Sequence, residues 1–181
     1  GSIALIFISL PIPAYQQLMV NLFGERWTDV FLYIRDGSFG ILSVIMVLSI
    51  SYSYGVEYNE RNGHVTSPII VSAVSLGSFI AILGINEEGF SISNFGVVGA
   101  FIAIVVASTS SLLFYKLISI RQLRINVYTD GANPIYNYAL ASALPAGITI
   151  LIFALANRAM DTSVGITDIQ QFISTIFTAL F

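Results

Sequence analysis

The sequence predicts an all-α membrane protein with about five transmembrane helices and additional amphipathic helices at the membrane interface. The 181 residues are 56% hydrophobic and only 9% charged, with a mean hydropathy of +0.85, whereas soluble domains carry roughly 25% charged residues. Charge is also absent from long windows, each at least as long as the roughly 20 residues that cross a bilayer as a helix. These windows are 1–24, 37–56, 62–86, 89–115 and 131–157.

The first window predicts the second half of a span that ends at Leu10, because Pro11 and Pro13 each remove a helical hydrogen-bond donor. Residues 14–34 mix Tyr and Trp with Gln, Glu, Arg and Asp, a combination typical of the headgroup level, and we interpret them as an interfacial connection. Because the chain opens inside apolar sequence, we expect residues 1–181 to be a single partial membrane domain cut from a longer protein.

Arg35 and Asp36 follow this connection. As neighbours on a helix they point about 100° apart, so we do not expect them to pair face to face. One interpretation is a charged pair that lines a polar path. The other, which is the more common arrangement, is an arginine that snorkels to the membrane boundary beside an exposed aspartate.

Three spans are expected next, over 38–58, over Val65–Ile85 with Pro68 tolerated in the first turn, and from about Gly96 to Tyr115. Hydroxyl side chains gather toward the end of the first of these: Ser49, Ser51, Tyr52, Ser53 and Tyr54. Such hydroxyls usually bond a carbonyl one turn back or a neighbouring helix. A ligand role is the less common alternative.

Two spans carry a face of small side chains at about every fourth residue, which lets a neighbouring helix backbone approach closely. The helix-packing residues are Gly99, Ala103, Ala107 and Ser111 in the fourth span, and Ala139, Ala143 and Gly147 in the fifth. We expect both faces to be buried against protein rather than lipid. Pro145 should kink the fifth span unless a neighbour satisfies the carbonyl that it frees. Beyond it, residues 166–181 predict an interfacial amphipathic helix rather than a sixth span.

Composition excludes several kinds of chemistry. The chain has no cysteine and one histidine, so it offers no thiol nucleophile, thiolate metal site or histidine cluster. We find no motif that pairs a nucleophile with a base or cradles a phosphate, so we assign no catalytic residue, cofactor, metal or nucleic-acid partner. His64 and the neighbours Glu87 and Glu88 lie in polar turns, where solvated side chains are the ordinary interpretation.

A basic connector separates the last two windows. Lys116, Arg121 and Arg124 are three of the seven basic residues and lie between uncharged runs, which is typical of a cytoplasmic loop between two spans. By parity, the polar turn at 57–64 lies on the same side of the membrane. That side then collects four basic residues and the other three, so the predicted orientation depends mainly on this connector.

Four stretches carry a resemblance to a known family: ISLPIPAYQQLMVNLFGERW, FGILSVIMVLSISYSYGVEY, FGVVGAFIAIVVASTSSLLFYKL and INVYTDGANPIYNYALASALPAGI. Together they resemble the membrane-embedded IIC subunit of the lactose/cellobiose/diacetylchitobiose family of the bacterial phosphotransferase system. The last stretch is the most specific, since it is similar to the family's signature around a loop and a downstream Leu-Pro turn. The resemblance covers essentially the whole chain, but only the N-terminal half of such a permease.

The resemblance implies a transporter component rather than an enzyme, in the bacterial inner membrane with several spans. It implies translocation of a disaccharide like cellobiose, lactose or chitobiose, with cytoplasmic IIB and IIA subunits as partners, a lipid environment and a homodimer. This half would be the scaffold and dimer interface. The alternative is a IIC-like sensory membrane domain of a bacterial signalling protein.

The resemblance also bears on sites. Substrate-binding residues stay unassigned, because the family carries most sugar ligands in the second membrane half. Residues of the connector are expected to dock the IIB partner: Lys116, Arg121, Arg124 and Asp130. The simpler interpretation is that the basic residues only set the topology through the positive-inside rule.

Overall fold

The computed structural model describes residues 2–63, 66–84, 95–97, 99–123 and 134–164. Its elements are α1 (Ser2–Ser9), α2 (Pro13–Phe23), α3 (Trp27–Phe39), α4 (Leu42–Asn62), α5 (Pro68–Leu83), α6 (Ala100–Ser119), the short 3-10 helix η2 (Arg121–Leu123) and α7 (Pro134–Val164). No strand occurs in these ranges. The predicted all-α class is therefore confirmed. The expected tail helix at 166–181 lies outside the described residues.

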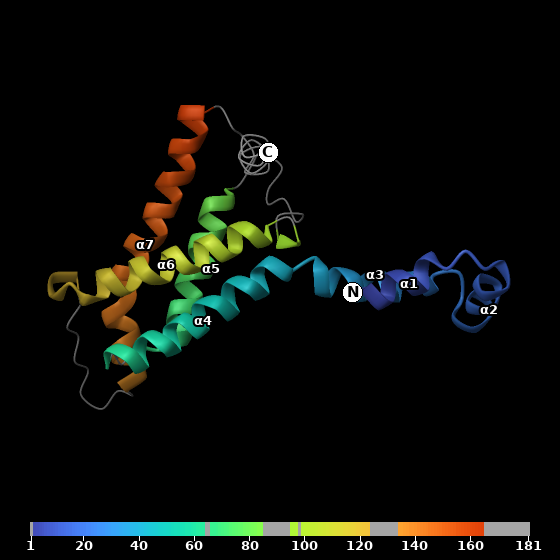
Figure 1. Cartoon of the computed structure of the whole chain (residues 1–181), viewed down its shortest axis with the longest axis horizontal. Helices are drawn as coiled ribbons and strands as arrows, with labels where there is room; N and C mark the ends of the chain where they lie inside the picture. The colour runs from blue at the N-terminus through green and yellow to red at the C-terminus, as the bar shows by residue number, and fades with distance from the viewer. Residues whose placement is uncertain (1, 64–65, 85–94, 98, 124–133, 165–181) are drawn as a thin grey trace.

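The helices form two parts, an N-terminal arm of α1–α3 and a bundle of α4–α7 (Figure 1). In the arm, α1 packs along α3, and the rings of Phe7 and Phe31 stack with centroids 5.6 Å apart. Trp27 is buried and meets the edges of Tyr15 and Phe31, each at 5.9 Å between centroids. Only two residues separate α3 from α4, so the arm projects from one end of the bundle.

The interfacial connection expected at 14–34 is itself helical. Pro13 stands at the first position of α2, where its missing N–H would have no helical partner anyway, and Gly24 ends the helix with φ of +84°. Leu18, Leu22 and Phe23 are exposed on a helix that also carries glutamine and asparagine. This mixture is typical of a helix that lies in the membrane interface.

The bundle places α5 against α4, α6 and α7, with α4 also packed along α6. The Ser43 hydroxyl near the start of α4 donates to the carbonyl of Phe95, just before α6. The Tyr115 hydroxyl near the end of α6 donates to Asn59 near the end of α4. The helices α4 and α6 therefore run parallel, and the two ends that were predicted to share one side of the membrane do lie together.

Five spans were predicted, and the described residues contain three helical stretches that could span a membrane. These stretches are Trp27–Asn62, Ala100–Ser119 and Leu140–Met160. The helix α5 has 16 residues and is bounded by Pro68 and Gly84. It is about 24 Å long, short of a bilayer core of about 30 Å. The structure describes α1, expected to be half of a span, over 8 residues.

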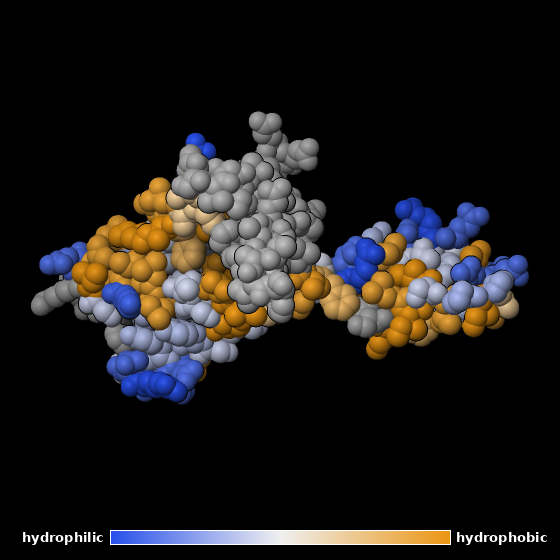
Figure 2. Space-filling model, turned by 45° about the horizontal axis from the view of Figure 1, so that its top comes forward, coloured by the Kyte–Doolittle hydropathy of each residue, from blue (hydrophilic) through white to orange (hydrophobic). Residues whose placement is uncertain are grey.

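The bundle surface agrees with a lipid environment. Figure 2 shows hydrophobic surface along the bundle and hydrophilic surface concentrated at the end away from the arm. Large apolar side chains are exposed on α6 and α7, among them Ile104, Val105, Leu151 and Leu155. Exposed apolar surface on this scale is typical of a membrane-facing or partner-facing protein.

Candidate functional site

The ends of α4 and α6 meet in a polar and aromatic cluster. The Tyr115 side chain is fully buried, and its hydroxyl lies 3.0 Å from Oδ1 of Asn59 and 3.1 Å from the carbonyl oxygen of Gly55. Its ring stacks on Tyr58 with centroids 4.0 Å apart. Asn59 donates in turn to the carbonyl of Thr66, which precedes α5. We call Gly55, Tyr58, Asn59, Thr66 and Tyr115 the Tyr115 cluster.

This cluster has a close backbone contact at its centre. A Cβ atom on Gly55 would lie 3.2 Å from both Cα and Cβ of Pro68. A glycine at this position therefore lets α4 approach the start of α5. The approach and the hydrogen bonds together hold the ends of three helices in one arrangement.

Charged side chains surround the Tyr115 cluster. Glu57 and Arg61 form an ion pair one turn apart, with 2.5 Å between Oε1 and a guanidinium nitrogen. Lys116 is exposed and forms no ion pair with any residue that the structure describes. Arg121 begins η2, which continues directly from α6, but its side chain, Arg124 and Asp130 lie outside the described part. Lys116 and the start of the connector therefore share one end of the bundle with Glu57 and Arg61.

The small face of α6 is buried, as its residue spacing predicts. Ala103, Ala107 and Ser111 are each fully buried, and Gly99 is buried at the helix start. Ala103 and Ala107 pack in the core with Val47 of α4 and Phe79 of α5. Hydroxyls add contacts to the same face: Ser110 lies 2.8 Å and Ser111 3.2 Å from the hydroxyl of Ser75.

The small-residue face of α7 is exposed and does not pack against the other helices of this chain. Ala143 and Gly147 are exposed, and no atom lies within 4 Å of a Cβ built on Gly147. The side chain of Ala139 is outside the described part. The residues that α7 buries are instead Ser142, Pro145 and Thr149. Within this chain, α7 therefore packs on a face rotated away from its small residues.

Pro145 does not interrupt α7, which continues from Pro134 to Val164. The Thr149 hydroxyl donates to the carbonyl of Pro145 at 2.8 Å, so one turn beside the proline gains a side-chain hydrogen bond. Further along, Asn157 donates to the carbonyl of Ala81 at 3.3 Å and joins α7 to the end of α5.

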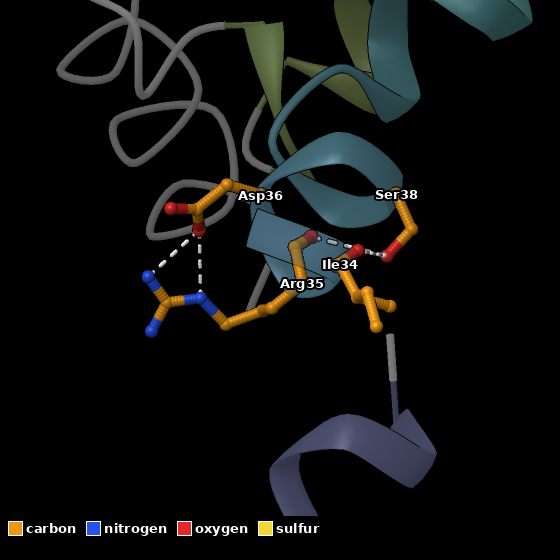
Figure 3. Close-up of polar contacts among 4 residues, drawn as sticks. All are labelled: Ile34, Arg35, Asp36 and Ser38. Carbon is orange, nitrogen blue, oxygen red and sulfur yellow. Dashed lines mark hydrogen bonds and ion pairs between the residues drawn. The ribbon is translucent and has the colours of Figure 1, made fainter. Parts of the chain in front are cut away.

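The expectation that Arg35 and Asp36 do not pair is wrong. Figure 3 shows the Arg35 guanidinium curled back over its neighbour, and both Nε and a terminal nitrogen lie 2.7 Å from Oδ1 of Asp36. The arginine side chain is long and flexible enough to cover the roughly 100° that separates neighbours on a helix. Both side chains are at least 40% exposed, so this is a surface pair on α3 of the arm. Such pairs contribute about 0–1 kcal/mol.

The hydroxyls toward the end of α4 fall into two groups. Ser51 is buried and donates to the carbonyl of Val47, one turn back, as most such serines do. Ser49, Tyr52 and Ser53 are exposed and form no hydrogen bond with any described residue. They line a shallow groove of about 500 Å³ between α4 and α5. We call it the hydroxyl groove, and its lining is Leu48, Ser49, Tyr52, Ser53, Ile69 and Ser72.

None of the other candidate residues forms a site in the part of the chain that the structure describes. The described residues contain no group of three His, Asp or Glu side chains that could hold a metal ion. His64, Glu87 and Glu88 are outside the described residues. Neither Asn59 nor the role of Tyr115 was predicted from the sequence. One signal was available, since Tyr115 is the last residue of an uncharged window, where amphipathic aromatics are common.

No family model matches the chain. Among curated proteins, it is 28% identical over 171 residues to the permease IIC component YwbA of Bacillus subtilis, which covers 89% of this chain and 38% of that protein. It is 25% identical over 190 residues to the lichenan permease IIC component of the same organism, covering 97% and 40%. It is 25% identical over 175 residues to the cellobiose-specific EIIC component of Geobacillus stearothermophilus, covering 89% and 37%.

Among solved structures, the chain matches the transporter ChbC, the IIC component of the N,N′-diacetylchitobiose-specific phosphotransferase system. The TM-score is 0.82 with 22% identity, over 99% of this chain and 43% of ChbC. The fold is therefore that of part of a IIC transporter. The chain spans about two fifths of the length of the proteins that it matches.

These matches confirm the resemblance predicted from the sequence. The curated relatives are IIC permease components, and the described helices include three that are long enough to span a membrane. A multi-pass membrane location is confirmed on the same grounds. The sensory alternative gains no support, because each of these relatives is named as a permease or transport component.

Proposed function

We propose that this chain is the scaffold part of a membrane-embedded IIC component that translocates a disaccharide in a phosphoenolpyruvate-dependent phosphotransferase system. The observation that supports this most is the fold match over 99% of the chain, joined to curated relatives that are permeases for sugars. The names of those relatives specify lichenan, cellobiose and diacetylchitobiose, which supports a disaccharide like cellobiose, lactose or chitobiose as the substrate.

The interior of the bundle suits a scaffold. Its core holds apolar side chains together with serines and threonines whose hydroxyls bond backbone carbonyls or each other. Among the residues that the structure describes, no buried side chain of the core carries a charge. Such an interior resists rearrangement, because helix contacts through small residues and hydroxyls are close and specific. The sugar is then held mainly by the part of the permease beyond these 181 residues.

A phosphorylated IIB subunit would dock at the end of the bundle that holds the Tyr115 cluster. Lys116 is exposed there, and the connector that follows adds Arg121, Arg124 and Asp130. Positive charge would attract a phosphorylated partner and speed its association. IIA would supply the phosphoryl group to IIB and would not need to touch this chain. In the simpler alternative, the same basic residues only orient the protein in the membrane.

Homodimer formation belongs to the same proposal. Ala143 and Gly147 leave a small-residue face of α7 exposed, and helices in lipid associate through such faces. The arm also exposes apolar side chains such as Ile3 and Phe23. Either surface would be covered by a second copy or by the rest of the permease.

The test of the proposed function uses the complete protein that carries this chain. Everted membrane vesicles that contain it are supplied with the soluble phosphotransferase proteins and phosphoenolpyruvate, and phosphorylation of cellobiose, diacetylchitobiose and lactose is measured. The proposal expects phosphorylation of at least one of these sugars. Vesicles that lack the protein are the control, and no sugar-dependent consumption of phosphoenolpyruvate above this control would contradict the proposal.

A further inference from the structure

The starting observation is a contrast among hydroxyls. In α4–α7, every serine or threonine whose side chain the structure describes takes part in a hydrogen bond, except Ser49 and Ser53. This includes exposed residues on other helices: Ser108 and Thr109 of α6 bond carbonyls of their own helix at 2.9 and 2.7 Å. Exposure alone therefore does not leave a hydroxyl without a partner.

The two serines belong to one face of α4. Ser49, Tyr52 and Ser53 stand at positions i, i+3 and i+4, which lie side by side on a helix. The hydroxyl of Tyr52 also lacks a hydrogen bond to any described residue, and its side chain is 47% exposed. Three hydroxyl groups and one aromatic ring are thus presented together.

The position of this face along α4 decides which groups can form hydrogen bonds with its hydroxyls. Ser49 and Ser53 lie inside the uncharged window 37–56, two turns and one turn before Glu57. A hydroxyl that faces lipid tails has no hydrogen-bond partner there, which is costly. Ser72 of α5 forms the facing wall and is itself satisfied by the carbonyls of Leu48 and Pro68. The unpartnered hydroxyls therefore need a polar occupant of the groove.

We propose that the hydroxyl groove is a carbohydrate-contact surface, the wall that this chain contributes to the sugar path of the complete permease. Carbohydrates present hydroxyls beside apolar C–H faces. Ser49 and Ser53 would form hydrogen bonds with the sugar hydroxyls. The ring of Tyr52 would contact an apolar C–H face of the sugar, and its hydroxyl would bond a sugar hydroxyl. This inference rests on the proposed function.

A helix is a poorer occupant than a sugar. The closest helix contacts in a membrane are made through small side chains. Tyr52 stands between Ser49 and Ser53 on this face and would keep a second helix backbone away from both. The groove volume of about 500 Å³ is also within the range of small-molecule sites. Ile69 at 69% exposure completes an apolar rim.

The test measures equilibrium binding of radiolabelled cellobiose and diacetylchitobiose to the purified complete protein in detergent. The variants are Ser49→Ala with Ser53→Ala, and Tyr52→Ala. The matched control is Ser108→Ala with Thr109→Ala, which removes two exposed hydroxyls that bond their own helix. We expect about tenfold weaker binding for each groove variant, as the loss of two hydrogen bonds or a stacking face implies, and unchanged binding for the control.

Thermal unfolding of the same preparations separates contact with sugar from packing. An unchanged dissociation constant in both groove variants would overturn the inference, and so would an equal loss of binding in the control. A lower unfolding temperature without weaker binding would assign the face to a helix instead and would also overturn it. If the unaltered protein binds none of these sugars, the proposed function fails, which is a different outcome from failure of the groove alone.

Discussion

The Tyr115 hydroxyl donates to Oδ1 of Asn59 across 3.0 Å and thereby joins the end of α6 to the end of α4. Asn59 continues the chain of bonds to the backbone of Thr66. The buried tyrosine consequently has a satisfied hydroxyl, and three helices share one fixed end. The basic connector starts one residue later, at Lys116, so the position of the proposed docking surface depends on this pair.

The Tyr115–Asn59 bond should contribute measurably to stability. Tyr115→Phe removes the donor and leaves Oδ1 of Asn59 without it, which should lower the free energy of unfolding by about 1 kcal/mol. Unfolding in mixed detergent micelles, followed by circular dichroism, measures this change. The control is Tyr52→Phe, because the Tyr52 hydroxyl bonds no described residue. Equal stability of the two variants would contradict the contribution of the bond.

The fully buried small face of α6 should not tolerate larger side chains. Ala107→Leu inserts three carbons where α6 packs against α4 and α5, and it should cost about 1–3 kcal/mol. Unfolding of the 181-residue chain measures the cost. The matched control is Ala143→Leu, the same substitution on the exposed face of α7, for which we expect little change in this chain. A larger cost at Ala143 than at Ala107 would contradict the burial pattern.

Gly63 and Gly84 both have positive φ, +63° and +71°, but they differ in ψ. Gly63, with ψ of 23°, is in the left-handed helical region, where an alanine costs about 1–2 kcal/mol. Gly84, with ψ of 172°, is in a region that essentially only glycine adopts. A Cβ on Gly84 would also lie 2.7 Å from Nδ2 of Asn157, whereas nothing lies within 4 Å of one on Gly63. We therefore expect Gly84→Ala to destabilise the chain more than Gly63→Ala in the same unfolding assay.

The opposite order would contradict both the backbone strain at Gly84 and its close contact with Asn157. Moving the Asn157 amide aside would also break its hydrogen bond to the carbonyl of Ala81.

The connector should affect docking rather than insertion. In the complete protein, Arg121→Gln with Arg124→Gln should raise the concentration of phosphorylated IIB needed for half-maximal sugar phosphorylation. The effect should shrink as salt is raised, since exposed charges are screened within about 10 Å at 0.1 M salt. Arg26→Gln is the control, because Arg26 lies in the arm with its side chain 88% exposed.

Accessibility labelling of the connector distinguishes the simpler alternative. If the double variant exposes the connector on the opposite side of the membrane, the arginines set topology. If phosphorylation and labelling both stay unchanged, neither role applies.

Local properties of the chain were readable from the sequence. The uncharged windows predicted a helical membrane protein, and Pro68 marked the start of a helix because a proline in the first turn removes no helical hydrogen bond. The spacing of Gly99, Ala103, Ala107 and Ser111 predicted a buried face, since small residues on one side let a neighbouring helix approach closely. The parity of the spans correctly placed the turn after α4 beside the end of α6.

Only the tertiary structure decided which faces and which side chains meet. In a membrane both the buried and the lipid-facing sides of a helix are apolar, so the hydropathy of α7 does not tell Ser142, Pro145 and Thr149 from Ala143 and Gly147. Likewise, the spacing of Arg35 and Asp36 describes the directions of their Cβ atoms, while their pairing depends on how a long guanidinium side chain folds back. Ser49 and Ser51 belong to the same hydroxyl-rich stretch, and nothing in the sequence distinguishes their surroundings. The packing of the other helices against α4 leaves Ser49 open to a groove and buries Ser51, because burial of a helix face is set by elements that are far away along the chain.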